Sequence, residues 1–144
     1  MVEVTLALGV VAISMLAILG LLAAGSQVNR TATDQTASSD ILSAVANDLR
    51  ATPGPTATSL GYGITIPSNP VASETRTTLY FNSAGEASTS QVSGSRYRLV
   101  LTFLPTGAGR FATRVSLRMT WPAAADPTNA NTQSAEMFLA LDRN

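Results

Sequence analysis

The feature that most constrains this chain is an apolar run close to its N-terminus. Residues 4–24 read VTLALGVVAISMLAILGLLAA, and only the hydroxyl residues Thr5 and Ser14 interrupt the run. As a helix rising about 1.5 Å per residue, the run would be about 31 Å long, close to the roughly 30 Å hydrocarbon core of a bilayer. We therefore predict that residues 1–25 form the membrane-spanning half of an N-terminal helix.

Composition narrows the classes of function that the chain can serve. All nine basic residues are arginines, and nine acidic residues balance them to a net charge of zero. This balance predicts no basic face for nucleic acid. The chain has no Cys and no His, which excludes zinc sites built on those ligands and nucleophilic catalysis through a histidine. We expect a protein that is not an enzyme and that binds no cofactor and no metal.

The only charge ahead of the apolar run is acidic, and it separates three interpretations of the run. A cleaved signal peptide needs a basic start and a shorter apolar stretch, so it ranks below a membrane anchor. Glu3 could lie solvated among the headgroups, near the positive end of the helix dipole. Alternatively, a carboxylate at the edge of a membrane helix has a specific role, because it is costly there unless it is paired.

Residues 1–11, MVEVTLALGVV, resemble the start of mature type IV pilins and type II secretion pseudopilins. In that family an aromatic residue, a Ser or Thr, two apolar residues and a glutamate precede a long apolar helix. The resemblance implies that Glu3 is the family's glutamate, which meets the N-terminal amine of a neighbouring subunit during assembly. Residues 3–9 also resemble, more narrowly, the prepilin-like cassette protein B group of Verrucomicrobia.

The match to the family has two departures. The basic leader, the glycine before the cleavage site and the first two mature residues have no counterpart ahead of Met1, so we expect the sequence to begin part-way through the motif. Many pilins also carry a proline near the middle of this helix. Gly20 is the closest substitute here, and we expect it to be the point of helix flexibility.

The resemblance also implies a location and a set of partners. The chain would sit in the bacterial inner membrane as a single-pass protein with its C-terminal domain in the periplasm, and would reach a filament or the cell surface after assembly. Its partners would be membrane lipid, other pilin or pseudopilin subunits, the prepilin peptidase and the assembly machinery. Arg30 alone would place its own end of the span in the cytoplasm, and we follow the family layout instead.

Residues 26–52 predict a second, water-exposed half of the helix. Apolar residues recur there with helical spacing, and the sequence TPGP at residues 52–55 predicts the end of the helix. The alternative is two helices joined by a polar linker at residues 26–39. The apolar stripe expected to pack on the C-terminal domain comprises Ile41, Leu42, Val45, Ala46 and Leu49.

Residues 53–144 change from helical to alternating periodicity, which predicts an antiparallel sheet. The clearest strand runs over residues 110–121, and a turn at residues 105–109 joins it to the preceding strand. Residues 82–86 predict another turn. The alternating sets of the expected strands are Phe111, Thr113, Val115, Leu117, Met119 and Trp121; Tyr97, Leu99, Leu101 and Phe103; Thr77, Leu79 and Phe81; and Met137, Leu139 and Leu141. A further short strand is expected at residues 62–66.

Three further features predict structure rather than chemistry. The loop at residues 126–131 holds oxygen-bearing side chains, but its spacing fits an Asx turn rather than a calcium site. Trp121 and Pro122 predict a core anchor at a strand end. The polar faces of the two central strands would gather arginines that either contact a partner or pair with acids such as Glu136: Arg96, Arg98, Arg110, Arg114 and Arg118.

Together these features predict an α+β, pilin-like fold, with a long N-terminal helix packed on a small antiparallel sheet. The predicted function is structural: a pilin or pseudopilin subunit of a type IV pilus-like or type II secretion filament, assembled by packing of N-terminal helices. The alternative is a single-pass anchored periplasmic binding domain that does not polymerise.

Overall fold

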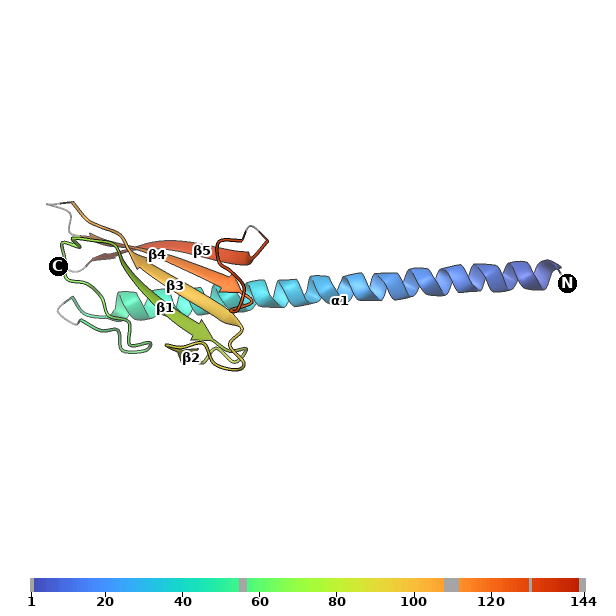
Figure 1. Ribbon diagram of the computed structural model, residues 1–144, viewed down its shortest axis with the longest axis horizontal. Helices are drawn as coiled ribbons and strands as arrows, with labels where there is room; N and C mark the ends of the chain where they lie inside the picture. The colour runs from blue at the N-terminus through green and yellow to red at the C-terminus, as the bar shows by residue number, and fades with distance from the viewer. Residues whose placement is uncertain (1, 55–56, 108–111, 130, 143–144) are drawn as a thin grey trace. The chain divides into compact units, whose positions relative to one another are not determined.

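The computed structural model describes residues 2–54, 57–107, 112–129 and 131–142, and contains one helix and five strands (Figure 1). The chain divides into two compact units, residues 1–35 and residues 36–144. The helix, α1, runs over Val2–Ala51 and contributes to both units. The α+β class expected from the sequence is confirmed.

Helix α1 is continuous across the polar residues 26–39, so the alternative of two helices with a linker is wrong. The hydroxyl side chains of the polar part bond within the helix. Thr31 Oγ1 donates to Gln27 O at 3.1 Å and Thr33 Oγ1 donates to Asn29 O at 2.9 Å. Each hydroxyl therefore bonds to a carbonyl one turn back within the helix, instead of competing with the helical backbone.

The helix ends at Ala51, as the TPGP sequence predicts. Thr52 closes the last turn, since its backbone N–H and its hydroxyl both donate to Asp48 O, at 3.1 and 2.8 Å. Pro53 follows and has no N–H with which to continue the helix. Pro55, the last residue of the predicted breaker, lies outside the described residues.

All five strands form one antiparallel sheet in the order β2-β1-β3-β4-β5. Strands β3 and β4 form the predicted hairpin, with Leu101 opposite Leu117. Arg110, Phe111 and the end of the predicted turn, residues 108–109, lie outside the described residues. The bounds are β1 Thr75–Phe81, β2 Ala87–Ser88, β3 Tyr97–Phe103, β4 Ala112–Trp121 and β5 Gln133–Asp142.

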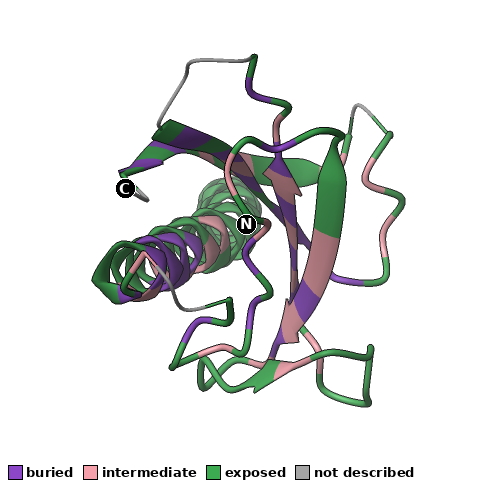
Figure 2. Cartoon of the chain, turned by 90° about the vertical axis from the view of Figure 1, so that its left-hand side faces the viewer, coloured by how far each residue is buried: buried purple, intermediate pink, exposed green. Residues whose placement is uncertain are grey.

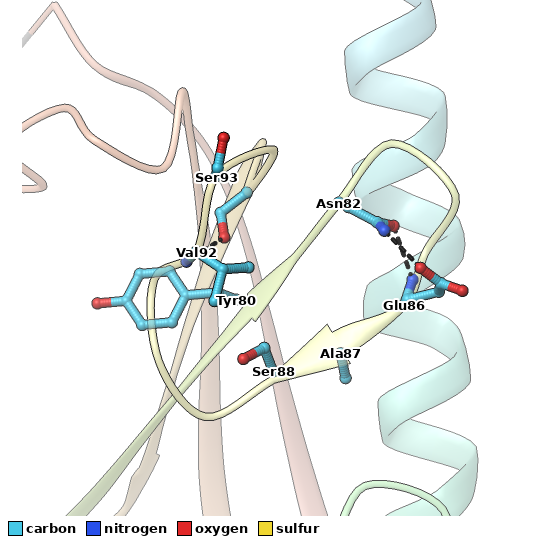
Figure 3. A pocket seen from close by; sticks show the side chains of 8 residues that line it. Tyr80, Asn82, Glu86, Ala87, Ser88, Val92 and Ser93 are labelled. Carbon is cyan, nitrogen blue, oxygen red and sulfur yellow. Dashed lines mark hydrogen bonds between the residues drawn. The ribbon is translucent and has the colours of Figure 1, made fainter.

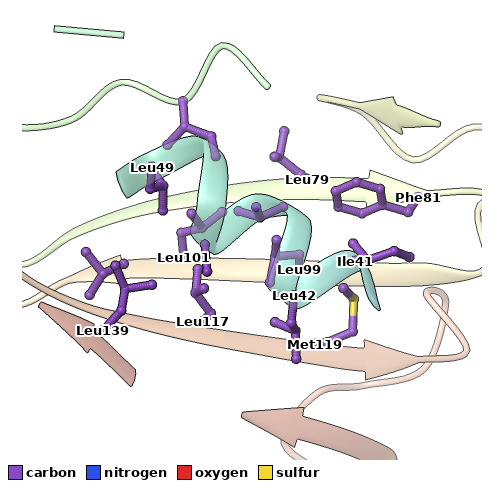
Figure 4. Close-up of a cluster of buried hydrophobic side chains, with 14 of the residues drawn as sticks. Ile41, Leu42, Leu49, Leu79, Phe81, Leu99, Leu101, Leu117, Met119 and Leu139 are labelled. Atoms are coloured by element: carbon purple, nitrogen blue, oxygen red, sulfur yellow. The ribbon is translucent and has the colours of Figure 1, made fainter. Parts of the chain in front are cut away.

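The core of the second unit lies between the sheet and the last part of α1. Figure 4 shows Leu42 and Leu49 of the helix among Leu99, Leu101 and Leu117 of the sheet. Buried and partly buried residues alternate along β3 (Figure 2). Burial of one such side chain stabilises the fold by roughly 1.5–3 kcal/mol. The predicted apolar stripe of the helix is buried throughout: Ile41, Leu42, Val45, Ala46 and Leu49.

The short strand predicted at residues 62–66 is wrong. This segment turns back at Gly63, where φ is +63°, and pairs with residues 57–59 through a single bridge between Thr58 and Thr65. Its apolar residues, Ile64 and Ile66, are buried against the core from a loop. The alternating pattern thus predicted correctly that Ile64 and Ile66 are buried, but it did not predict that they lie outside the sheet.

Candidate functional site

The first unit exposes an apolar surface on every side of the helix. From Val2 to Leu22 its large side chains keep between 51% and 73% of their surface exposed. One helix of the described chain, α1, is long and apolar enough to cross a membrane. Its apolar part lies near the N-terminus. A contiguous apolar surface of this extent is stable when lipid or other apolar side chains cover it, and not in water.

The two hydroxyl residues within the apolar run do not conflict with a lipid environment. Thr5 Oγ1 donates to Val2 O and Ser14 Oγ donates to Val10 O, both at 2.8 Å. A hydroxyl without a partner in hydrocarbon costs several kcal/mol, of the order of 2–7. Because both donors find partners within the helix, the apolar run at residues 4–24 needs no water along its length.

Glu3 lies in the first turn of α1 and is exposed. It forms no hydrogen bond or ion pair with the part of the chain that the structure describes. The helix dipole favours a negative charge at this end. Its carboxylate is therefore available to a group from outside the described chain, which is the geometry that pairing with a neighbouring subunit needs. The pairing itself remains a prediction.

Gly20 is helical, within the unbroken α1. A methyl group added at its Cα would meet no atom within 4 Å. Packing within the chain therefore does not require glycine at this position. Its expected role as a point of flexibility stays a prediction.

The arginines predicted on the polar sheet face bind to groups of their own chain. Arg118 Nε lies 3.2 Å from Glu136 Oε1, and the two residues are directly opposite on β4 and β5. Arg114 donates to Pro105 O at 2.9 Å, and Arg98 donates to Ala125 O. The cross-strand pairing with Glu136 is confirmed, and Arg110 lies outside the described residues.

The loop at residues 126–131 contains the predicted Asx turn. Asp126 Oδ1 accepts hydrogen bonds from Thr128 Oγ1 at 2.7 Å and from Thr128 N at 2.8 Å. These two bonds, in that order, lower the pKa of Asp126 below its usual value, and the charge of Arg98 contributes in the same direction. Partial loss of solvation opposes them. Ala130 of this loop lies outside the described residues.

Trp121 is buried at the end of β4, which confirms its predicted role as a core anchor. Its ring meets Tyr97 edge to face at a centroid distance of 6.4 Å. The indole Nε1 donates to Gln133 Oε1 on β5, so the polar atom of the side chain has a partner.

A small pocket beside β2 was not foreseen from the sequence (Figure 3). It measures about 150 Å³, below the roughly 300 Å³ at which pockets for drug-sized ligands begin. The turn at residues 82–86 forms one wall, where Asn82 Nδ2 donates to Glu86 Oε2 at 2.6 Å. Tyr80 and Val92 also line the pocket. No sequence motif marks it, because its residues come together only through the β1–β2 pairing.

Comparisons with protein-family models, with curated proteins and with solved structures find no match for this chain. The functional argument therefore depends on the chain's own residues.

Proposed function

We propose that this protein is a structural, non-enzymatic subunit of a type IV pilus-like or type II secretion filament. It would be held in the bacterial inner membrane by the first part of α1, with the sheet unit in the periplasm. Other pilin or pseudopilin subunits would be its partners, and the apolar helices would pack together in the filament. The observation that carries the proposal is a helix whose apolar run at residues 4–24 covers all its sides and is preceded by an exposed carboxylate.

The apolar surface supports two environments for one segment. In the membrane, lipid would cover residues 4–24. In a filament, the same side chains would pack against helices of other subunits, so transfer between the two would leave the area of apolar surface hidden from water nearly unchanged. A helix with one polar face would not suit a single span that lipid surrounds on all sides.

Glu3 limits the arrangements in which the helices can pack. A charged carboxylate inside packed apolar helices is strongly destabilising unless an opposite charge meets it. The N-terminal amine of an adjacent subunit, offered by the family resemblance, would supply that charge. Subunits would therefore be stable in the bundle only in the register that brings an amine to each Glu3.

The test is to replace Glu3 in the natural host and to measure membrane insertion and filament incorporation separately. For Glu3→Ala we expect unchanged membrane content, since the apolar run remains, and at least a tenfold loss of incorporation, since breaking a buried charge pair costs about 3–5 kcal/mol. Sheared filament fractions and washed membranes are compared by immunoblot.

Glu3→Asp is the matched control, because it keeps the charge and should retain part of the incorporation. Asp40→Ala is a second control, since Asp40 is exposed on the same helix but within the second unit. Full incorporation of Glu3→Ala would rule out the pairing role.

The pocket beside β2 favours a second candidate, an anchored periplasmic domain that binds a small polar group and never polymerises. Its walls offer the side chains of Asn82, Glu86 and Ser88. This candidate requires that Asn82→Ala abolish the activity of the protein in its host and that Glu3→Ala leave that activity unchanged. The filament proposal requires that Glu3→Ala abolish the activity and that Asn82→Ala leave it unchanged.

A further inference from the structure

Strand β5 is a long edge strand with one neighbour. It pairs with β4 over ten residues in an unbroken register, from Trp121 opposite Gln133 to Ala112 opposite Asp142. Within the described chain no strand lies on its other side. Alternate N–H and C=O groups of β5 therefore point away from the sheet. The opposite edge, β2, has only two residues.

Strand β5 lacks most of the features by which edge strands usually avoid pairing. Such strands carry charged side chains, especially Lys, or Pro or a β-bulge, or are very short. The charged residues of β5 are Glu136, which pairs with Arg118 of β4, and Asp142, at the end of the strand. The sequence of β5, QSAEMFLALD, contains neither Pro nor Lys, and its constant register with β4 leaves no bulge. The edge is thus regular enough to accept another strand.

Phe138 marks the outer face of this edge. It is 69% exposed, although it lies between Met137, which is partly buried, and Leu139, which is buried. The only other large hydrophobic side chains exposed in the described part of the second unit are Leu60 and Val92, and both lie in loops. An exposed aromatic residue in the middle of an open edge strand is suited to pairing across strands.

We propose that β5 pairs with β5 of a second copy of this chain, antiparallel and about a two-fold axis at Phe138. In this register the two Phe138 rings are directly opposite each other on the outer face. Glu136 lies opposite Ala140 of the second copy, and Ser134 lies opposite Asp142. On the inner face only apolar residues meet: Met137 opposite Leu139, and Ala135 opposite Leu141.

Charge and the aromatic pair together select this register over its neighbours. A shift of the axis to Glu136 would place the two Glu136 carboxylates opposite each other. A shift of the axis to Leu139 would place Glu136 opposite Asp142 of the second copy. Like charges directly opposite are destabilising in a sheet. An axis at Met137 would place Phe138 opposite Glu136, which loses the aromatic pair. Only the axis at Phe138 both separates the acids and joins the aromatic residues.

The chain contains no cysteine, so introduced cysteines can report the register directly. Chains carrying Glu136→Cys and chains carrying Ala140→Cys are mixed as full-length protein in detergent micelles and oxidised. The proposed register places these two residues about 4.5–5.5 Å apart between Cα atoms, within disulfide range. Two Glu136→Cys chains would hold their cysteines about 13 Å apart along the strand, beyond that range.

We expect disulfide dimers in the mixture and at least tenfold fewer with either chain alone. Glu86→Cys mixed with Ala140→Cys is the matched control, since Glu86 is exposed at the other end of the sheet. Equal yields in mixed and single samples, or no dimer in any sample, would overturn the proposal.

A second measurement separates pairing from fold stability. Phe138→Arg should weaken dimerisation roughly tenfold, because the aromatic contact is lost and two like charges meet. Leu60→Arg, a change at a comparably exposed residue, should leave dimerisation unchanged. The mixed disulfide should also form in the Glu3→Ala background, because the contact does not depend on the proposed helix packing. Its loss there would assign the contact to the helix and overturn the proposal.

Discussion

Single residues in this protein show how polar groups hold loops in place. The carboxylate of Asp48, near the end of α1, accepts hydrogen bonds from Gly61 N at 2.8 Å and Tyr62 N at 3.2 Å. A Cβ at residue 61 would lie 2.9 Å from Asp48 Oδ1. A side chain at residue 61 would therefore displace the Asp48 carboxylate from these two hydrogen bonds, which hold the loop that covers the core.

Asp126 gives a prediction at the residue scale. Its pKa is lowered in the folded protein, so the stability it contributes is present above its unfolded pKa, about 3.9, and is lost as pH falls through the folded pKa. Thr128→Val removes the largest cause, the hydroxyl hydrogen bond, and should raise the pKa of Asp126. Thr128→Ser, which keeps a hydroxyl, should leave it close to wild type.

The measurement is a carbon-detected NMR titration of the Asp126 carboxyl in the full chain. A pKa that does not change in Thr128→Val would show that the hydroxyl bond seen in the structure is not maintained in solution.

At the scale of elements, α1 serves two environments with one regular structure. Its apolar residues surround the helix in the first unit and form a single stripe in the second. Substitution of a leucine by alanine should therefore have different effects in the two units. Leu42 is 2% exposed within the core, whereas Leu19 is 62% exposed in the apolar run.

We expect Leu42→Ala to lower the free energy of unfolding of the sheet unit by roughly 2–5 kcal/mol, because it leaves a cavity in a packed core. Leu19→Ala should change that free energy by less than about 0.5 kcal/mol. Denaturant unfolding of the full chain in micelles, followed by Trp121 fluorescence, measures both. Equal losses from the two substitutions would contradict the burial pattern.

At the scale of the whole molecule, the two units depend on different sources of stability. The second unit depends on a core between sheet and helix, whereas the helix of the first unit keeps its backbone hydrogen bonds wherever lipid or detergent covers it. Trp121, the only tryptophan of the chain, reports on the second unit alone.

We expect heating in micelles to give two separate events. Trp121 fluorescence should change in one cooperative transition, while much of the helical circular dichroism remains at higher temperature. Addition of more detergent should not shift the Trp121 transition. A single coincident loss of both signals would indicate that the chain unfolds as one unit.

Local features of this chain were readable from its sequence. The apolar run, the TPGP break and the alternation in β3 and β4 depend on composition and on side-chain period. Both are properties of residues that are close together in the sequence. The helical stripe from Ile41 to Leu49 was found for the same reason. The assembly role of Glu3 comes from a resemblance over a short segment, and it stays a prediction.

Other features were decided only by the tertiary structure. Residues 62–66 have the alternation of a strand but lie in a loop, because a period of two records burial on one side and not which segment lies alongside. The pocket beside β2 and the contact of Asp48 with Gly61 arise where distant segments meet. Phe138 is visible as an apolar residue on the wet face of β5, yet only the strand order places β5 at an edge, where its backbone can pair again.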